Sequence, residues 1–406
     1  MVFEYKNPLS ITSQFSFCGM PFRLDTYSGC DFLCIYCFSH KRGGNSNYKN
    51  IKIADPDLII NKFRNSLEKP KINTGLISQY IRRRMPIHFG GMSDPFQNIE
   101  KKAQVSLKVL KFLCSINYPV VISTKSNLLI NKEYLETLKS NPNLIIQYSF
   151  SILNDDLSKI IEPNSPTSTE KINSLKVLSK HNINTIIRWQ PYIVGLSENP
   201  LEFVSKIKNS GTKHLIIEFL KLPADNNLAW ETSLKPLNKV RDYYNKKNSI
   251  VIGRELILPP KEKVETIRIL KNELKKYNIT LGVGDNELQY LSDTECCCGV
   301  DKYKGFENWN KFQISYAIIK SINNQIKFST IEKQWSPTGS IDKFLNSESR
   351  IEKNKDFNRV SDYIIDRWNN LSSDFNPSKY FEVEDSGLMD EKEFRIFEFR
   401  KSKTKP

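Results

Sequence analysis

The sequence predicts an α/β protein built on a partial (β/α)6 TIM-like barrel with a C-terminal α+β extension. Short, almost wholly apolar segments recur between residues 22 and 222, and polar segments with helical spacing separate them. This alternation loosens from about residue 223. Strands that are apolar on both faces are typical of a parallel sheet covered by helices. We therefore expect an N-terminal segment (1–21), a barrel (22–290) and an extension (291–406).

The predicted barrel strands are six apolar segments: 22–27, 86–91, 119–124, 144–152, 184–194 and 213–222. The predicted helices between them cover 99–117, 131–141, 168–182 and 199–211. The first of these helices has an apolar stripe that runs from Val105 to Leu113. Asn and Ser at the helix starts, and Gly211 after the last helix, are residues expected at helix ends.

Further elements are predicted beyond residue 222. Residues 222–248 are expected to be a loop and then a helix, and 249–258 a strand. Residues 259–278 are expected to be a helix with Pro in its first turn, and 279–288 another strand. After three consecutive cysteines at 296–298, a segment rich in Trp, Phe and Lys is expected to form the small extension.

The charge of the chain favours a polyanionic partner. The formal net charge is +15 at pH 7, which points first to nucleic acid. A coding sequence rich in A and T would give the same excess of Lys, Asn and Ile. Arg82, Arg83 and Arg84 cannot share one helix face, so we expect at least two to be exposed, either contacting phosphate or merely solvated.

The distribution of apolar residues along the chain bears on the cellular location of the protein. No apolar run approaches the ~20 residues that span a bilayer, so no membrane partner is expected. The N-terminal residues lack the charged start and apolar core of a secretory signal. We expect a cytoplasmic, reducing location, in which clustered cysteines bind metal rather than form disulfides.

Three cysteines lie close together after the first predicted strand. Cys30, Cys34 and Cys37 have the spacing C-x3-C-x2-C, with Tyr36 directly before the last. Four thiolates normally complete a [4Fe-4S] cluster, so three leave one iron open for a small molecule. The alternative is a zinc site with Cys18 as fourth ligand. Structural zinc sites usually use paired C-x2-C hooks, however, and the hook at Cys34 has no second one nearby.

This motif, its tyrosine and its place after the first strand resemble the signature of the radical S-adenosylmethionine (radical SAM) superfamily. The resemblance implies a [4Fe-4S] cluster whose open iron binds S-adenosylmethionine, with electrons from an external one-electron donor. It also implies cleavage of the cofactor to a 5′-deoxyadenosyl radical that abstracts hydrogen from a substrate. Segments 21–40 and 92–102 further resemble the spore photoproduct lyase and DNA repair photolyase-like branch, the second through D-P-F-Q-x-x-E from Asp94 to Glu100. This likeness covers roughly residues 18–220.

The resemblance also implies cofactor-binding positions. A glycine-rich turn after the second strand contacts the methionine amino group in the family, and that turn is Gly90, Gly91, Met92 and Ser93 here. The family's usual acidic third residue is Met92 in this chain, which leaves the contact to backbone carbonyls, Ser93 or Asp94.

Polar residues at the ends of later strands are further candidates. These are Lys125, Ser126, Ser149 and Arg188. A cation there suits the carboxylate of the cofactor, although each could instead pair with a neighbouring acid at the barrel rim. Tyr36 is expected to pack against the adenine.

Cys296, Cys297 and Cys298 are adjacent, so backbone geometry is expected to keep all three from binding one metal. Two of them, with Cys18, could hold a second metal centre. Alternatively, Cys297 or Cys298 could donate a hydrogen atom to a product radical, the role of a cysteine in spore photoproduct lyase. A third interpretation is plain packing of buried cysteine.

The predicted function is a radical SAM enzyme that abstracts hydrogen from a nucleic-acid or nucleotide-type substrate. One alternative is a radical SAM enzyme that modifies a peptide or protein and carries an auxiliary cluster. The other is a non-catalytic, metal-containing protein that binds nucleic acid.

Overall fold

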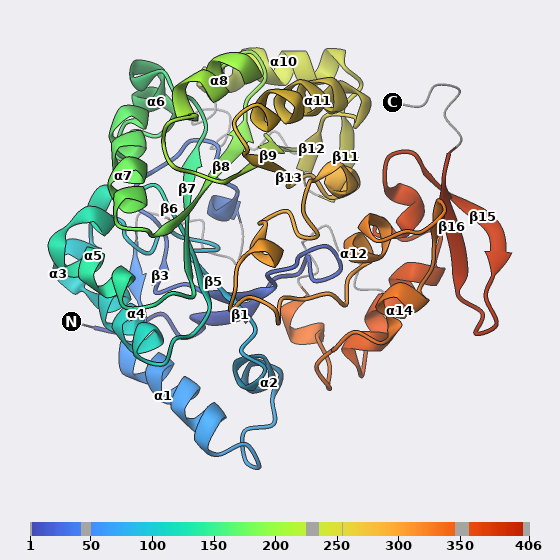
Figure 1. The fold of residues 1–406 in the computed structure, drawn as a ribbon, viewed down its shortest axis with the longest axis horizontal. Helices are drawn as coiled ribbons and strands as arrows, with labels where there is room; N and C mark the ends of the chain where they lie inside the picture. The colour runs from blue at the N-terminus through green and yellow to red at the C-terminus, as the bar shows by residue number, and fades with distance from the viewer. Residues whose placement is uncertain (1, 42–49, 225–234, 254, 346–356, 401–406) are drawn as a thin grey trace.

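The computed structural model describes residues 2–41, 50–224, 235–253, 255–345 and 357–400 (Figure 1). Its main sheet has eight strands in the order β1-β2-β5-β6-β7-β8-β9-β13. β1 is antiparallel to β2, and the other neighbours are parallel. The strands are β1 (Leu9–Ile11), β2 (Phe22–Leu24), β5 (Ile87–Phe89), β6 (Val120–Thr124), β7 (Leu144–Phe150), β8 (Asn184–Tyr192), β9 (His214–Phe219) and β13 (Thr280–Val283). The predicted α/β class and its six strands are confirmed.

Helices surround this sheet on the outside (Figure 1). They include α1 (Pro56–Glu68), α2 (Leu76–Arg82), α4 (Val105–Ser115), α5 (Lys132–Lys139), α6 (Asp155–Ile161), α7 (Ser168–Lys180), α8 (Pro200–Ile207), α10 (Asn238–Lys246) and α11 (Lys261–Lys275). The predicted helix 99–117 is broken into α3 (Glu100–Ala103) and α4. Gln104 causes the break, because its φ of 50° is left-handed.

The predicted strand 249–258 is wrong as a single element. It is a hairpin of β11 (Ile250–Ile252) and β12 (Glu255–Ile257), which pairs with β10 (Leu222–Pro223) in a separate antiparallel sheet. Gly253, with φ of 58°, lies where the chain reverses. The predicted strand within 279–288 is β13, which joins the main sheet beside β9.

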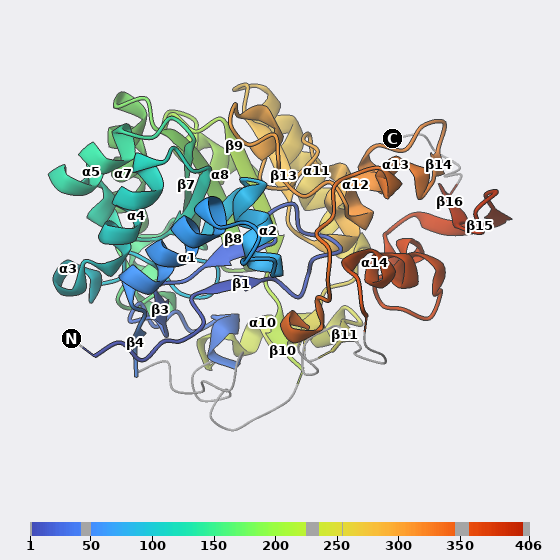
Figure 2. The same cartoon turned by 90° about the horizontal axis from the view of Figure 1, so that it is seen from below.

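The C-terminal part adds a second α+β layer beside the sheet (Figure 2). Its strands β14 (Gln325–Ile326), β16 (Arg395–Phe399) and β15 (Val383–Met389) form an antiparallel sheet, accompanied by α12 (Ile314–Ile319), α13 (Ser329–Glu332) and α14 (Val360–Asn369). The backbone N–H groups of Asn310 and Ile314 donate to the carbonyls of Gly19 and Ser16, each at 2.9 Å. The extension therefore packs on the N-terminal segment.

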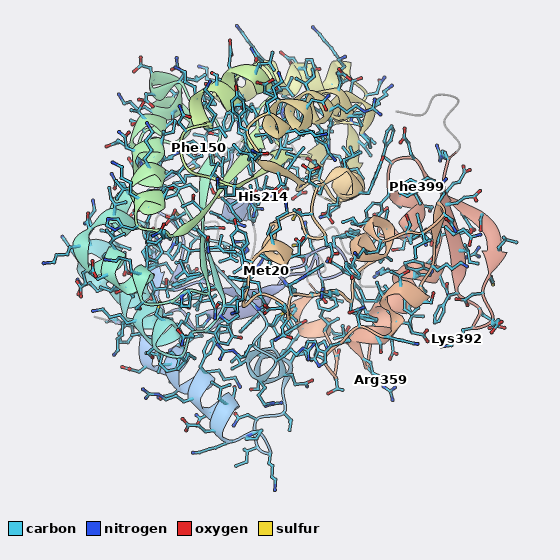
Figure 3. All side chains as sticks on the ribbon, in the orientation of Figure 1. Met20, Phe150, His214, Arg359, Lys392 and Phe399 are labelled. Carbon is cyan, nitrogen blue, oxygen red and sulfur yellow. The ribbon has the colours of Figure 1, made fainter. Side chains whose placement is uncertain are left out.

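One apolar core runs through both parts. The labelled side chains of Met20 and His214 lie in the middle of the molecule, whereas Lys392 lies at its periphery (Figure 3). Within the described parts of the chain, no helix combines the length and apolar character needed to cross a bilayer.

Candidate functional site

The loop that carries Cys30, Cys34 and Cys37 is anchored by the segment that follows β5. Gln97 accepts a hydrogen bond from the Asp31 backbone N–H at 2.7 Å and donates to the carbonyl of Gly29 at 3.1 Å. The Asp31 carboxylate accepts from the backbone N–H groups of Asn98 and Ile99, each at 3.1 Å. Gln97 of the D-P-F-Q-x-x-E segment thus fixes the start of the cysteine loop.

Glu100, the last residue of that segment, is fully buried. Its carboxylate accepts from the backbone N–H groups of Ser106 and Leu107, at 3.0 and 2.8 Å, and so caps the start of α4. It also accepts from the hydroxyls of Tyr27 and Tyr134. Because Tyr27 lies just before the cysteine loop, Glu100 ties that loop to α4.

A cavity of about 250 Å³ opens at the carboxyl ends of the strands. All three loop cysteines line it, and so does every predicted cofactor-binding residue except Ser126: Tyr36, Gly90, Gly91, Met92, Ser93, Lys125, Ser149 and Arg188. Ser126 is instead buried, and its hydroxyl accepts from the Leu128 N–H at 3.1 Å as a helix cap. Residues from five segments far apart in the sequence therefore meet at one pocket.

The three loop cysteines are less tightly grouped than the three consecutive cysteines 296–298. In the described chain, the group of metal-ligating side chains whose ligand atoms all lie within 4.8 Å of one another is Cys296, Cys297 and Cys298, and the loop cysteines do not meet that limit. Cys30, Cys34 and Cys37 nevertheless face one shared cavity.

The glycine-rich turn is held by Asp25, which directly follows β2 and is not among the predicted site residues. The buried Asp25 carboxylate accepts from the N–H groups of Met92, at 2.8 Å, and Ser93, at 3.3 Å. Burial raises the pKa of this carboxyl to about 6.

Gly90 has a φ of 95°, and a Cβ there would lie 2.5 Å from the carbonyl oxygen of Ser123. Only glycine fits this turn.

Lys125 takes part in a buried ionic network centred on Glu162. Its Nζ lies 3.1 Å from Glu162 Oε1 and 5.7 Å from the centre of the Tyr36 ring, whose hydroxyl donates to the same carboxylate. Lys171 Nζ lies 2.7 Å from Glu162 Oε2, and Ser151 donates at 2.6 Å. Burial alone would raise the pKa of Glu162, but the two ammonium groups hold it well below its usual range. Glu162 therefore positions both Lys125 and Tyr36 at the pocket.

Arg188 also lines the pocket and pairs with an acid. Its Nη2 lies 3.6 Å from Glu218 Oε2, and its Nη1 donates to Gln147 at 3.4 Å. A second guanidinium, that of Arg23 on β2, lines the same pocket. Arg23 donates to the Met92 sulfur at 3.7 Å, and its buried Nε has no hydrogen-bond partner among the described residues. The pocket wall thus carries two guanidinium groups, and Arg188 is the one that pairs with an acid among the described residues.

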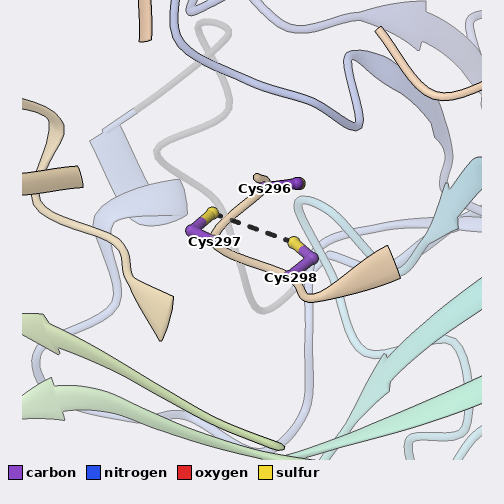
Figure 4. A group of neighbouring side chains, drawn as sticks. All are labelled: Cys296, Cys297 and Cys298. Carbon is purple, nitrogen blue, oxygen red and sulfur yellow. Dashed lines mark hydrogen bonds between the residues drawn. The ribbon is translucent and has the colours of Figure 1, made fainter. Parts of the chain in front are cut away.

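The three consecutive cysteines lie outside this pocket lining. Their sulfurs all lie within 4.8 Å of one another, and those of Cys297 and Cys298 face each other at 4.0 Å (Figure 4). The expectation that adjacency keeps all three from one ion is therefore wrong. The chain turns tightly at Gly299, where φ is 62°.

Two of the three consecutive arginines, 82–84, donate hydrogen bonds to backbone carbonyls of the fold. Arg82 donates to the carbonyl of Asn73, and Arg84 donates to that of Ile116 at 3.1 Å. Arg83 is exposed, and the other two are half-buried. The expectation of at least two exposed arginines is wrong, because two of them satisfy backbone carbonyls.

No protein-family model matches the chain. It is 24% identical over 212 residues to the uncharacterized protein MJ0683 of Methanocaldococcus jannaschii, a match that spans 51% of this chain and 73% of that protein. A spore photoproduct lyase complexed with dinucleoside spore photoproduct is similar in structure, with 14% identity, a TM-score of 0.49 and coverage of 68% of this chain and 79% of the lyase.

Another similar structure is SuiB of Streptococcus suis bound to S-adenosylmethionine. Its identity is 17% and its TM-score 0.35, with coverage of 57% of this chain and 48% of SuiB. Both similar structures are of radical SAM enzymes.

Proposed function

We propose that the chain is a radical SAM enzyme that abstracts hydrogen from a nucleic-acid or nucleotide-type substrate. The observation that carries the proposal is the single pocket shared by Cys30, Cys34, Cys37, the glycine-rich turn and the polar strand ends. Cys30, Cys34 and Cys37 would hold a [4Fe-4S] cluster with an open iron for S-adenosylmethionine. When bound, this pair supplies a 5′-deoxyadenosyl radical.

The residues of the chain bind and orient the cofactor. The turn from Gly90 to Ser93 presents its backbone to the methionine amino group, and Asp25 holds that turn by accepting hydrogen bonds from two of its backbone N–H groups. Lys125 and Arg188 offer charged donors to the cofactor carboxylate. Tyr36, held by Glu162, presents its ring to the adenine. Ser149 lines the same wall as a neutral hydrogen-bonding group.

The proposed substrate class rests on charge. The net charge of +15 favours a polyanion, and Arg23 and Lys221 add positive charge to the pocket wall. A peptide or protein substrate is the second candidate. An external one-electron donor is required in both cases, and a cytoplasmic location remains part of the proposal.

The three consecutive cysteines belong to the proposal in one of two roles. A hydrogen-atom donor role for Cys297 or Cys298 stays a prediction, and neither residue is among those that line the pocket. A second metal centre with Cys18 is favoured by the closeness of the three sulfurs.

Iron content tests the proposal. The wild-type chain and a variant with Cys30, Cys34 and Cys37 replaced by Ala should be reconstituted anaerobically with iron and sulfide. We expect the variant to lose about four irons per chain and the broad iron–sulfur absorbance. A Cys114→Ala variant is the matched control, because Cys114 is a buried core residue on α4. Equal iron content in the triple variant and the wild type contradicts the proposal.

A further inference from the structure

Cys296, Cys297 and Cys298 meet in an arrangement that suits one metal ion. Their sulfurs lie within 4.8 Å of one another, with 4.0 Å between those of Cys297 and Cys298 (Figure 4). With zinc–sulfur bonds of about 2.3 Å, the sulfurs of a tetrahedral site stand roughly 3.8 Å apart. Cys296 and Cys298 are buried, at 3% and 5% exposure. The spacing is therefore that of ligands on a single ion, whereas a cluster would need them farther apart.

The backbone around these cysteines is fixed by neighbouring strands. The Gly299 N–H donates to the carbonyl of Cys296 at 2.7 Å, and a Cβ at Gly299 would lie 2.9 Å from the His214 ring. His214, at the start of β9, donates from Nε2 to the carbonyl of Cys297 at 2.8 Å. Its Nδ1 lies 2.9 Å from the hydroxyl of Thr280 at the start of β13. The turn is thus built against two strands of the sheet before any ion is bound.

The N-terminal segment carries a fourth cysteine, Cys18, beside the group. A Cβ on Gly19 would lie 2.5 Å from the Cys296 sulfur, so the residue after Cys18 lies directly against the turn, whereas the Cys18 sulfur is not among the three that lie within 4.8 Å of one another. The Cys18 carbonyl accepts from Asn310 at 3.1 Å, which holds the segment there.

An independent observation is the buried guanidinium of Arg23, on the strand that follows Cys18 in the sequence. The Arg23 Nε is buried and has no hydrogen-bond partner in the described chain. Burying a cation is costly unless a negative group neutralises it. Four thiolates on one divalent ion carry a net charge of −2, the kind of negative group that the Arg23 guanidinium requires, whereas Arg188 already pairs with Glu218.

We propose that Cys18, Cys296, Cys297 and Cys298 bind one Zn²⁺ ion behind the pocket wall. A four-thiolate site is closed, so the ion holds structure and carries out no chemistry. It joins the N-terminal segment, the cysteine turn and the base of the pocket, which are far apart in the sequence. The proposal uses none of the three loop cysteines and stands without the proposed function.

Cobalt binding tests this site separately from the cluster. The full chain with Cys30, Cys34 and Cys37 replaced by Ala should be titrated anaerobically with Co²⁺, a spectroscopic substitute for Zn²⁺. We expect one equivalent to bind, with the charge-transfer absorption of a tetrahedral thiolate site, and Zn²⁺ to displace it. If the folded triple variant shows no such absorption, the proposal is wrong, because this variant retains all four proposed ligands.

Two further variants in this background locate the ion. Cys298→Ser should weaken Co²⁺ binding at least tenfold, and Cys18→Ser should replace one sulfur by oxygen and reduce the charge-transfer intensity by about a quarter. Cys114→Ser should leave both unchanged, because Cys114 lies on α4 outside the group. Binding that is indifferent to Cys298→Ser, or uptake of iron with equimolar sulfide at these thiols, overturns the single-ion assignment.

Discussion

Replacing Glu162 by Gln removes one negative charge from the centre of a buried network. Glu162 is 1% exposed, and Lys125 and Lys171 lie at 3.1 and 2.7 Å from its two oxygens. Glutamine keeps the shape but leaves two ammonium groups without a counter-charge. Breaking a buried ion pair by removing one partner costs ~3–5 kcal/mol. We expect the free energy of unfolding of Glu162→Gln to fall by about that amount.

The dependence on pH follows from the lowered pKa of Glu162. Its pKa in the folded chain lies below the ordinary 4.5, because the two ammonium groups outweigh the effect of burial. The charged carboxylate therefore stabilises the fold fully at neutral pH, and this contribution is lost as the pH falls below about 4.5 toward the folded pKa. The difference between wild type and Glu162→Gln should shrink over that acid range.

Urea unfolding of the cluster-free protein, followed by circular dichroism, measures both effects. Glu133→Gln is a matched control, because Glu133 also pairs with a lysine at 2.7 Å but is 53% exposed. An exposed pair contributes at most ~1 kcal/mol. Equal losses of stability in the two variants would show that the buried Glu162 network stabilises the fold no more than an exposed ion pair does, which would contradict the prediction.

Three other predictions concern the pocket and the charge. Lys125→Ala or Arg188→Ala in a protein that keeps its cluster should weaken S-adenosylmethionine binding by ~1.5–3 kcal/mol in calorimetry; unchanged affinity in both refutes their assignment. Gly90→Ala should lower stability by ~1–3 kcal/mol, since its φ is 95°, whereas Gly75→Ala, with open space around the added methyl group, is the control. Oligonucleotide binding should weaken steeply with salt, with a log–log slope of ~0.7–0.9 per phosphate contact. A flat response would mean that the charge is compositional.

The strands and the three-cysteine motif were predictable because each depends on local sequence. The apolar segment 144–152 predicts a buried strand, and β7 lies within it. The D-P-F-Q-x-x-E segment is likewise visible as a local motif, although the sequence alone does not give the contacts of Gln97 with Gly29 and Asp31.

The supporting residues were not predictable, because their roles depend on contacts between distant segments. Glu162 lies 37 residues beyond Lys125 in the sequence, and no spacing rule links the two. Asp25 lies within the predicted strand 22–27, and its carboxylate accepts from the Met92 N–H only because β2 and β5 are neighbours. The hairpin at 249–258 is hard to predict because its two apolar runs, 250–252 and 256–258, are separated by only three residues.

Formation of 5′-deoxyadenosine tests the central claim most directly. The anaerobically reconstituted chain should be incubated with S-adenosylmethionine and a strong one-electron reductant, and the products separated by chromatography. The account predicts 5′-deoxyadenosine from the wild type and from Cys114→Ala, and none from the variant with Cys30, Cys34 and Cys37 replaced by Ala. A wild-type chain that holds its cluster and binds S-adenosylmethionine, yet forms no 5′-deoxyadenosine, would contradict the account.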